Sequence, residues 1–266
     1  MRVRSLLFVP AHRPELLGKV GRVHPDAVVA DLEDAVAPPE KSSARVTVLA
    51  ALAATRPGAD LVLVRINAPG TEWFADDVAA VAASSAVDGV VLPKYEDAGR
   101  LSALRAALPP GARVVVGIES ALGVADARPL LAAAPDAVYF GAEDYIADLG
   151  GRRTPDGMEV LYARSQVCLA ARLAGVLPID EAVVDVRDEE AFRRSAEVGR
   201  ALGYRGKICI HPAQVEAARA LFTPTEAELA EAKAVVAAAD QGVTVINGRM
   251  VDAVHVTMAR NLLRDT

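Results

Sequence analysis

Short apolar runs rich in valine and isoleucine recur along the chain, and longer segments with helical spacing separate them. Runs of this kind fit strands that are covered on both faces, as the strands of parallel sheets are. The intervening segments, such as 97–107 and 187–202, are long enough to form crossover helices. The strands predicted in this way are Ser5–Val9, Ala27–Leu32, Leu61–Ile66, Gly89–Leu92, Arg113–Ile118, Ala137–Phe140, Ile179–Val184 and Lys207–Ile210.

Eight alternating β and α units predict an α/β fold, a (β/α)8 or TIM barrel, over residues 1–222. The composition agrees, because 52% hydrophobic and 24% charged residues suit buried strands surrounded by amphipathic helices. A single domain of 266 residues is therefore expected.

The last segment, 223–266, lies outside this repeat. Thr225 has the position of an N-cap ahead of a helix over 226–239, and a second amphipathic segment runs from about 252 to 263 after a break at 240–248. We expect this C-terminal helical extension to belong to the same domain and to reach a neighbouring subunit.

The charge, the lengths of the apolar runs and the cysteine content limit the partners and the cellular location that the sequence allows. A net charge of −6 leaves no basic footprint for nucleic acid or an anionic membrane surface. No apolar run approaches the roughly 18 residues of a membrane span, and the run at 6–10 lacks a signal-peptide pattern. Cys168 and Cys209 have apolar neighbours, which favours buried free thiols in a reducing compartment. A soluble, cytoplasmic protein is expected.

Polar side chains stand at the carboxyl ends of nearly all the predicted strands, where the catalytic groups of such barrels sit. They are His12, Arg13, Asp31, Glu33, Asp34, Arg65, Asn67, Lys94, Glu119, Asp144, Asp180 and His211. A rim that mixes acids and bases indicates a site for an anionic substrate built around a divalent metal.

Glu119 and Asp144 carry the sharpest chemical signal, because each directly follows a buried apolar run and both should reach one hard cation. No His or Cys accompanies them, so Mg²⁺ or Mn²⁺ is favoured over Zn²⁺, with the remaining ligands coming from the substrate. The alternative is that both acids cap helices or pair with Arg65 and Lys94.

The rim bases also have two interpretations each. Arg65 has a planar fork that suits a carboxylate or a developing enolate oxygen, and a salt bridge to a rim acid is its alternative role. Lys94 could form a Schiff base or pair with Glu33 or Asp34. Those acids, together with Asp31, could supply metal ligands or simple ion pairs.

Nine stretches match one known family in order and spacing along nearly the whole chain. They are Arg4–Pro10, Asp31–Val36 with Lys41 and Arg45, Val64–Asn67, Leu92–Lys94, Gly117–Ser120, Gly141–Asp144, Lys207–Gln214, Phe222–Pro224 and Gly248–Asp252. In these stretches the chain resembles the citrate lyase β-subunit-like proteins of the HpcH/HpaI aldolase superfamily, which includes malyl-CoA and citramalyl-CoA lyases.

The resemblance implies roles for the rim residues. Glu119 and Asp144 would bind Mg²⁺, which would hold a 2-oxo acid such as oxaloacetate or glyoxylate. Arg65 would contact a substrate oxygen, and the backbone at Glu143 and Asp144 would form a carboxylate cradle. The coenzyme A contacts implied are Phe8, Arg13, Lys19, Ile210 and His211.

Asp252 matches the family's catalytic aspartate, which acts on the site of an adjacent subunit. A homo-oligomer, either a trimer or a hexamer, is therefore implied. The residue pattern alone gives Asp252 a second reading, as the N-cap of the last helix.

The activity implied is that of a Mg²⁺-dependent acyl-CoA lyase. It would reversibly cleave a 2- or 3-hydroxy-carboxyacyl-CoA, such as malyl-, citramalyl- or citryl-CoA, into an acetyl-CoA-type thioester and a 2-oxo acid. The alternatives are an acyl-CoA thioesterase or malate-synthase-like activity at the same site, a carrier-dependent citrate lyase β subunit, a Schiff-base aldolase using Lys94, and a non-catalytic oxaloacetate-binding protein.

Overall fold

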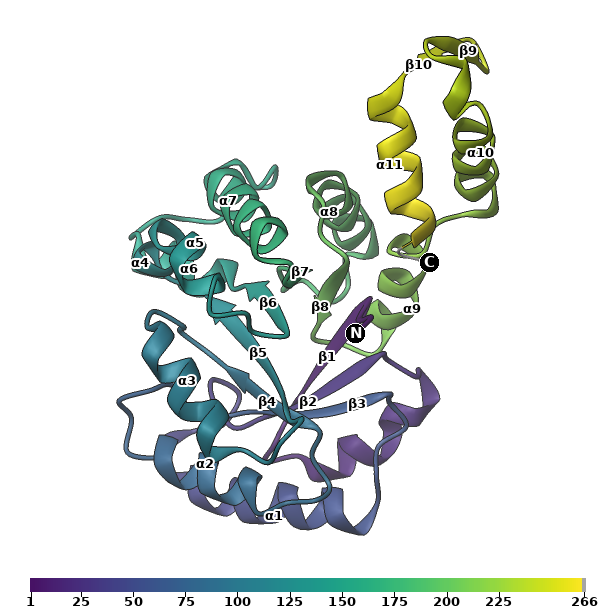
Figure 1. Ribbon diagram of the computed structural model, residues 1–266. Coiled ribbons are helices and arrows are strands. Elements are labelled where there is room, and N and C mark those ends of the chain that lie inside the picture. The colour runs from purple at the N-terminus through teal and green to yellow at the C-terminus, as the bar shows by residue number, and fades with distance from the viewer. Residues whose placement is uncertain (265–266) are drawn as a thin grey trace. The chain divides into compact units, whose positions relative to one another are not determined.

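The computed structural model describes residues 1–264, apart from the side chain of Gln241, and its larger part is a closed barrel of parallel strands with helices around the outside (Figure 1). The predicted TIM-barrel architecture is confirmed. The strands are β1 (Ser5–Pro10), β2 (Ala27–Asp31), β3 (Leu61–Arg65), β4 (Gly89–Leu92), β5 (Arg113–Ile118), β6 (Ala137–Phe140), β7 (Leu177–Asp180) and β8 (Gly206–Cys209).

A helical segment follows each of these strands, and polar side chains mark several of the starts. Asp97 and Asp188 accept backbone N–H groups and so cap the helices that follow them. The segments are η1 (Pro14–Arg22), η2 (Pro38–Glu40), α1 (Lys41–Ala54), α2 (Phe74–Ala82), α3 (Ala98–Ala107), α4 (Ala121–Ala125), α5 (Ala127–Leu131), α6 (Ala142–Asp148), α7 (Met158–Ala174), α8 (Glu189–Leu202) and α9 (Ala213–Leu221).

Alternation along the strands divides the apolar side chains between two layers. The barrel closes because β1 pairs in parallel with both β2 and β8, with Ser5 beside Lys207 at the closure. The inner layer contains Leu6, Val29, Leu63, Val91, Val115, Tyr139, Ile179 and Ile208. Side chains that continue this inner alternation past the strand ends enter the barrel mouth, which is where a site can form.

The seventh strand starts and ends earlier than predicted, at Leu177–Asp180 instead of Ile179–Val184. Proline at position 178 lacks an N–H donor, which disfavours a strand there. Its carbonyl nevertheless accepts a hydrogen bond from the Arg205 N–H at 2.9 Å, so Pro178 still takes part in the parallel ladder. The other predicted strands agree with the structure to within one residue at each end.

The predicted position of Asp180 at the rim is wrong, because its side chain is fully buried on the outer face of β7. Its carboxylate accepts hydrogen bonds at 2.7 Å from both Arg164 and Lys207. Burial opposes ionisation, but the charges of Lys207 and Arg164 outweigh it and lower the pKa of Asp180. Its ion pairs therefore stabilise the fold above about pH 4 and are lost as the pH falls through the lowered pKa.

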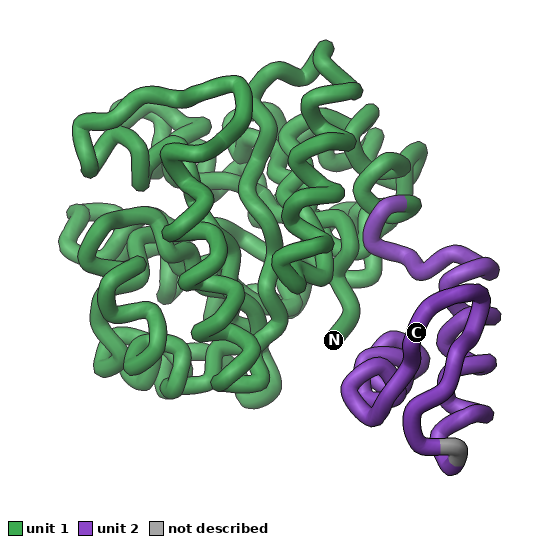
Figure 2. The backbone as a smooth tube through the Cα atoms, turned by 90° about the horizontal axis from the view of Figure 1, so that it is seen from above, with its two compact units in different colours: residues 1–220 green, residues 221–266 purple. Residues whose placement is uncertain are grey.

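The chain from Leu221 onward forms a second compact unit, which begins two residues before the boundary expected from the sequence (Figure 2). Its first helix is α10 (Glu226–Ala237), and Thr225 caps it in a reciprocal capping box with Glu228. The predicted N-cap is thus confirmed. The last helix is α11 (Ala253–Arg264), which packs against α10.

The segment predicted as a break at 240–248 contains regular structure. After the short turn η3 (Ala239–Gln241), an antiparallel hairpin pairs β9 (Thr244–Ile246) with β10 (Arg249–Val251). Asn247 and Gly248 at its tip both have positive φ, which is the requirement of a tight two-residue hairpin turn. An Asn-Gly pair therefore indicated a hairpin as well as a break.

Both cysteines are free and buried, as predicted. Burial raises the pKa of Cys168 to about 11 and that of Cys209 to about 12. Within the described residues, no helix has the length and apolar character needed to cross a membrane.

Removing the buried carboxylate by Asp180→Ala should lower the stability of the barrel by about 3–5 kcal/mol, because Arg164 and Lys207 would remain buried without their partner. Glu190→Ala removes an exposed ion pair to Arg194 and should change stability by less than about 0.5 kcal/mol. Urea unfolding followed by circular dichroism measures both effects. Equal unfolding midpoints for the two variants would contradict the role assigned to Asp180.

Candidate active site

A cavity of about 240 Å³ lies at the carboxyl ends of the strands. It is smaller than the roughly 300–1,000 Å³ of sites for drug-sized ligands, and so suits a small organic acid. Its walls are formed by Phe8, Pro10, Asp31, Ala35, Arg65, Glu119, Tyr139, Phe140, Gly141, Ala142, Glu143, Asp144, Ala182, Ile208 and Ile210.

Glu119 follows β5 and lies deep in the cavity, with 3% of the residue exposed. The Tyr139 hydroxyl donates to its Oε1, and the Lys94 backbone N–H donates to its Oε2 at 2.9 Å. Burial raises the pKa of Glu119, and the nearby charge of Asp144 raises it further, against the opposing effect of Arg65. Hydrogen bonds therefore fix the position of this carboxylate, but the neighbouring positive charge offsets its negative charge only in part.

Two glycines make the space that Glu119 occupies. A Cβ on Gly141 would lie 2.5 Å from the Glu119 Cγ, and a Cβ on Gly117 would lie 2.8 Å from its Oε1 and 2.5 Å from the Tyr139 hydroxyl oxygen. All three distances are far below van der Waals contact, so any larger residue at either position would displace the carboxylate. The two glycines therefore determine where Glu119 lies.

Arg65, at the end of β3, forms the salt bridge that was its alternative role. Its Nε and Nη2 donate to the two carboxylate oxygens of Asp31 at 2.6 and 2.7 Å. Its Nη1 lies 2.9 Å from Glu33 and 3.3 Å from Asp34, and its guanidinium stacks 5.2 Å from the centre of the Phe8 ring. The two hydrogen bonds to Asp31 fix the plane of the guanidinium group, and Nη1 points toward Glu33 and Asp34.

Lys94 pairs with rim acids, as one of its two interpretations predicted. Its Nζ lies 3.1 Å from Glu33, 3.7 Å from Asp144 and 3.9 Å from Asp34. Burial opposes its charge, but Glu33 and Asp34 outweigh burial and raise the pKa of Lys94. A lysine held in its ammonium form is a poor Schiff-base nucleophile, so the structure does not favour the covalent role.

Glu33 is a strongly perturbed acid of the rim. Burial raises its pKa to about 8, with Arg65 opposing the shift and Glu119 adding to it. Neither of its carboxylate oxygens has a hydrogen-bond partner among the described residues, although both lie in ion-pair range of a cation. A further positive charge would satisfy this group.

A buried lysine supports the loop that carries these acids. The Nζ of Lys41 donates to the carbonyls of Leu32 and Glu33 at 2.9 Å and to the Asn67 side chain at 2.6 Å. Asn67, predicted among the polar rim residues, is in turn bound by Asp77 at 2.7 Å. Both residues thus position the loop from behind.

Glu143 and Asp144 lie in the first turn of α6, beside the cavity. Burial raises the pKa of Asp144, and the charge of Asp34 raises it further, while Lys94 opposes the shift. The Glu143 carboxylate is bound by Arg153 from the loop that follows α6. The structure therefore brings Asp144 and Glu119 to the same cavity.

The residues fit a divalent cation. The acids around the cavity are Asp31, Glu33, Asp34, Glu119 and Asp144, and the cations paired with them are Arg65 and Lys94. The raised pKa values of Glu33, Glu119 and Asp144, and the two Glu33 oxygens without a hydrogen-bond partner, show that positive charge only partly compensates these three acids. Within residues 1–264, no group of three or more His, Cys, Asp or Glu side chains surrounds one point. This donor set suits Mg²⁺, which keeps positions for water and substrate.

The residues implied in coenzyme A binding have two different environments. Phe8 and Ile210 line the cavity. Arg13 and Lys19, before and within η1, are exposed and do not line it, and His211 is exposed at the start of the turn into α9. Only the first two residues are therefore brought together with the acids of the cavity.

Asp252 lies in the second unit, where it caps α11 as predicted from the residue pattern. Its Oδ1 accepts the N–H groups of Val254 at 3.0 Å and His255 at 3.3 Å, and it lies 2.7 Å from the His255 ring nitrogen Nδ1. The His255 side chain lowers the pKa of Asp252, so this exposed carboxyl group is ionised at neutral pH.

Two residues of the site were missed by the sequence analysis. Tyr139 could have been found, because it follows Ala137 at the two-residue spacing that points alternate side chains into the barrel. Arg153 carries no such signal, since its partners come together only through the fold.

A closed eight-stranded barrel with an acid-rich cavity at its strand ends defines the chain as a TIM-barrel protein with an enzyme-like site. The model of the HpcH/HpaI aldolase/citrate lyase family matches residues 4–212. The chain belongs to this family, which is an enzyme family.

Individual relatives carry several activities in their names. The chain is 44% identical to a citrate lyase subunit beta-like protein from Deinococcus radiodurans, over 98% of this chain and 96% of the relative. It is 36% identical to a (3S)-malyl-CoA thioesterase from Cereibacter sphaeroides, over 98% of this chain and 93% of the relative. A solved structure of the protein CitE from Mycobacterium tuberculosis, in complex with magnesium, acetoacetate and coenzyme A, matches with a TM-score of 0.84 and 36% identity, covering 98% of this chain and 97% of that one.

A methyl group at position 141 should move Glu119 out of its place between Tyr139 and Lys94. Gly141→Ala should therefore weaken Mn²⁺ binding by roughly 10- to 100-fold, the usual effect of disturbing the placement of a metal ligand, in a titration followed by electron paramagnetic resonance. Gly151→Ala is the control, because its new Cβ would meet Ile146 only at 3.6 Å. Equal Mn²⁺ affinities for both variants would contradict the arrangement described for Glu119.

Proposed function

We propose that the protein is a Mg²⁺-dependent acyl-CoA lyase, which reversibly cleaves a 2- or 3-hydroxy-carboxyacyl-CoA into an acetyl-CoA-type thioester and a 2-oxo acid. The observation that carries this proposal is the pair Glu119 and Asp144 in one small, acid-rich cavity beside Arg65. Relatives solved with magnesium and with oxaloacetate, acetoacetate or coenzyme A support it. We also propose a cytoplasmic location, which two buried free thiols support.

Glu119 and Asp144 would hold Mg²⁺, and the 2-oxo acid and water would complete its coordination. When bound, the metal supplies positive charge that stabilises the oxygen on the reacting carbon. Arg65, fixed by Asp31, offers its Nη1 to the same developing negative charge. Glu143, next to Asp144, contributes to substrate binding at the cavity wall.

Asp252 would transfer the proton. In cleavage, the ionised carboxylate of Asp252 would first take the proton of the hydroxyl group, whose carbon becomes the carbonyl carbon of the 2-oxo acid. The bond between that carbon and the α-carbon of the thioester breaks, and Asp252 would return the proton to the enolate carbon that is left. In the reverse direction, Asp252 removes that proton, for which its ionised form is suited. We propose that Asp252 serves the barrel of a neighbouring subunit in a trimer or hexamer.

The coenzyme A portion would lie outside the small cavity. Phe8 and Ile210 would contact the thioester end, because they line the cavity wall. Arg13, Lys19 and His211 are exposed and would contact the remainder of the coenzyme.

A second candidate activity is hydrolysis of the thioester, which the 36% identity to a malyl-CoA thioesterase favours. The two activities differ in their products. A lyase releases an acetyl-CoA-type thioester and a 2-oxo acid, whereas a thioesterase releases free coenzyme A and the hydroxy acid. Both would use the same acidic cavity.

Purified protein should cleave at least one of malyl-, citramalyl-, citryl- and 3-hydroxy-3-methylglutaryl-CoA in a reaction that EDTA abolishes and Mg²⁺ restores. Product analysis by mass spectrometry separates cleavage from hydrolysis. Glu119→Gln and Asp144→Asn should abolish turnover, because each removes a charged oxygen ligand. Turnover that persists in EDTA would contradict the proposal, and inactivity with every ester would favour the carrier-dependent or non-catalytic alternatives.

Asp252→Ala should lower kcat by roughly 10²–10⁴-fold, the usual contribution of a general acid or base, while KM changes little. Asp240→Ala, an exposed acid in the same unit, should leave both unchanged. Mixing the inactive Asp252→Ala and Glu119→Gln proteins under subunit exchange should restore activity. In some mixed assemblies, the barrel of an Asp252→Ala subunit, which keeps Glu119, would receive the intact Asp252 of a neighbouring Glu119→Gln subunit. No restoration would show that Asp252 serves its own barrel.

A further inference from the structure

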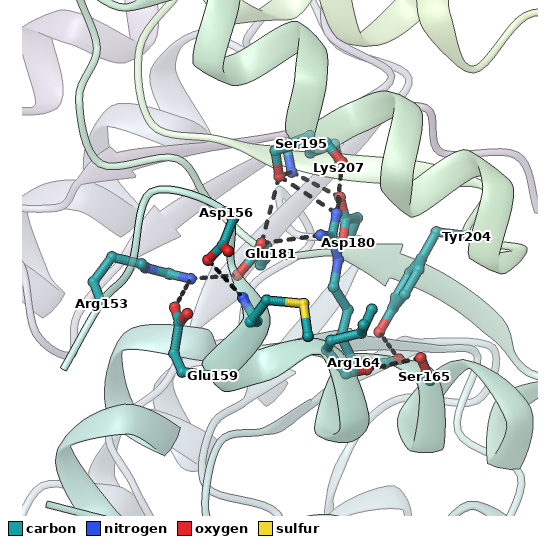
Figure 3. Close-up of polar contacts among 12 residues, drawn as sticks. Arg153, Asp156, Glu159, Arg164, Ser165, Asp180, Glu181, Ser195, Tyr204 and Lys207 are labelled. Carbon is teal, nitrogen blue, oxygen red and sulfur yellow. Dashed lines mark hydrogen bonds and ion pairs between the residues drawn. The ribbon is translucent and has the colours of Figure 1, made fainter. Parts of the chain in front are cut away.

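Arg153, in the loop between α6 and α7, connects the cavity rim to the interior of the barrel unit. Its Nε lies 3.1 Å from Glu143, which lines the cavity. Its Nη1 lies 3.1 Å from Glu181 and 3.3 Å from Glu159 (Figure 3). One guanidinium thus joins three acids that come from α6, α7 and the segment after β7.

Glu181 anchors this arginine to a buried set of ion pairs. Its side chain is 6% exposed and lies 3.3 Å from Arg164, which also binds Asp180 (Figure 3). Asp180 in turn pairs with Lys207 of β8 at 2.7 Å. Because these groups lie between the strands and helices α7 and α8, Arg153 is attached to a buried part of the barrel wall.

The loop that carries Arg153 follows a short helix and turns at two glycines. The helix α6 has seven residues, and Gly150 and Gly157 have positive φ, a backbone region that glycine enters without steric cost. The contact of Arg153 with Glu143 is a charged link between this loop and the turn that carries Asp144.

We propose that Arg153 is a positioning residue that clamps Glu143 to Glu181 and thereby holds Asp144 at the cavity. The proposal rests on the proposed function, since the position of Asp144 matters only if it binds the metal. Without Arg153, the acids Glu143 and Glu181 would lose their shared cation, and the first turn of α6 would lose this ion-pair link to the barrel wall.

An arginine is the residue type that this role requires. Its planar guanidinium presents donors in several directions at once and so can serve three carboxylates. Burial opposes its charge, but Glu181 and Glu143 outweigh burial and raise the pKa of Arg153. A lysine at this position would provide one point charge and could bridge fewer of these acids.

The test is direct Mn²⁺ binding to the full-length protein, measured by electron paramagnetic resonance. Arg153→Ala should weaken Mn²⁺ binding by roughly 10- to 100-fold, the usual effect of losing a group that orients a metal ligand. Arg153→Lys should recover part of the loss. The control is Arg152→Ala, an exposed neighbour of the same type, which should bind Mn²⁺ like the wild type. Saturating Mg²⁺ should restore most of kcat in Arg153→Ala.

A double-mutant cycle with Glu143→Gln separates positioning from a loss of folding. If Arg153 acts through Glu143, then Arg153→Ala should weaken Mn²⁺ binding much less in the Glu143→Gln background than alone. Equal losses in both backgrounds, or an Mn²⁺ affinity of Arg153→Ala equal to that of Arg152→Ala, would overturn the inference. Absence of Mn²⁺ binding by the wild type would instead overturn the proposed function.

Discussion

An excess of acidic side chains at the barrel mouth is the constraint on which the candidate site depends. Glu33, Glu119 and Asp144 all have raised pKa values there, mainly because burial disfavours their charge. Arg65 relieves part of this cost, but Asp31 already binds two of its nitrogens. Burying several carboxylates together costs free energy, and a bound cation would offset that cost. The small volume of the adjacent cavity limits the size of the anion that could bind beside the cation.

The acids are held in place by neighbouring residues that are not themselves acids. Lys41 supports the loop after β2 from behind, and Gly117 and Gly141 leave the space that the Glu119 side chain occupies. Arg153 performs a similar task at α6 through ion pairs that continue into the barrel wall. The geometry of the site is therefore a property of the whole barrel unit.

The sequence predicted the barrel well because each buried strand is a distinct apolar run, and it predicted that Glu119 and Asp144 share one mouth because parallel strands end together. It failed where tertiary contacts overrule local pattern. Asp180 has the sequence position of a rim acid, but its side chain lies on the outer face of β7, where it pairs with Arg164 and Lys207. The partners of Arg153 are separated by many residues, so no local motif could have shown them.

The two buried thiols also have a practical consequence. At neutral pH, Cys168 and Cys209 contain almost no thiolate, which is the form that alkylating reagents attack. A cysteine introduced on an exposed position of the second unit, such as Val254, would then react selectively with a maleimide dye or a spin label. In the proposed homo-oligomer, the distance distribution between labelled copies would report directly how the second units are arranged in solution.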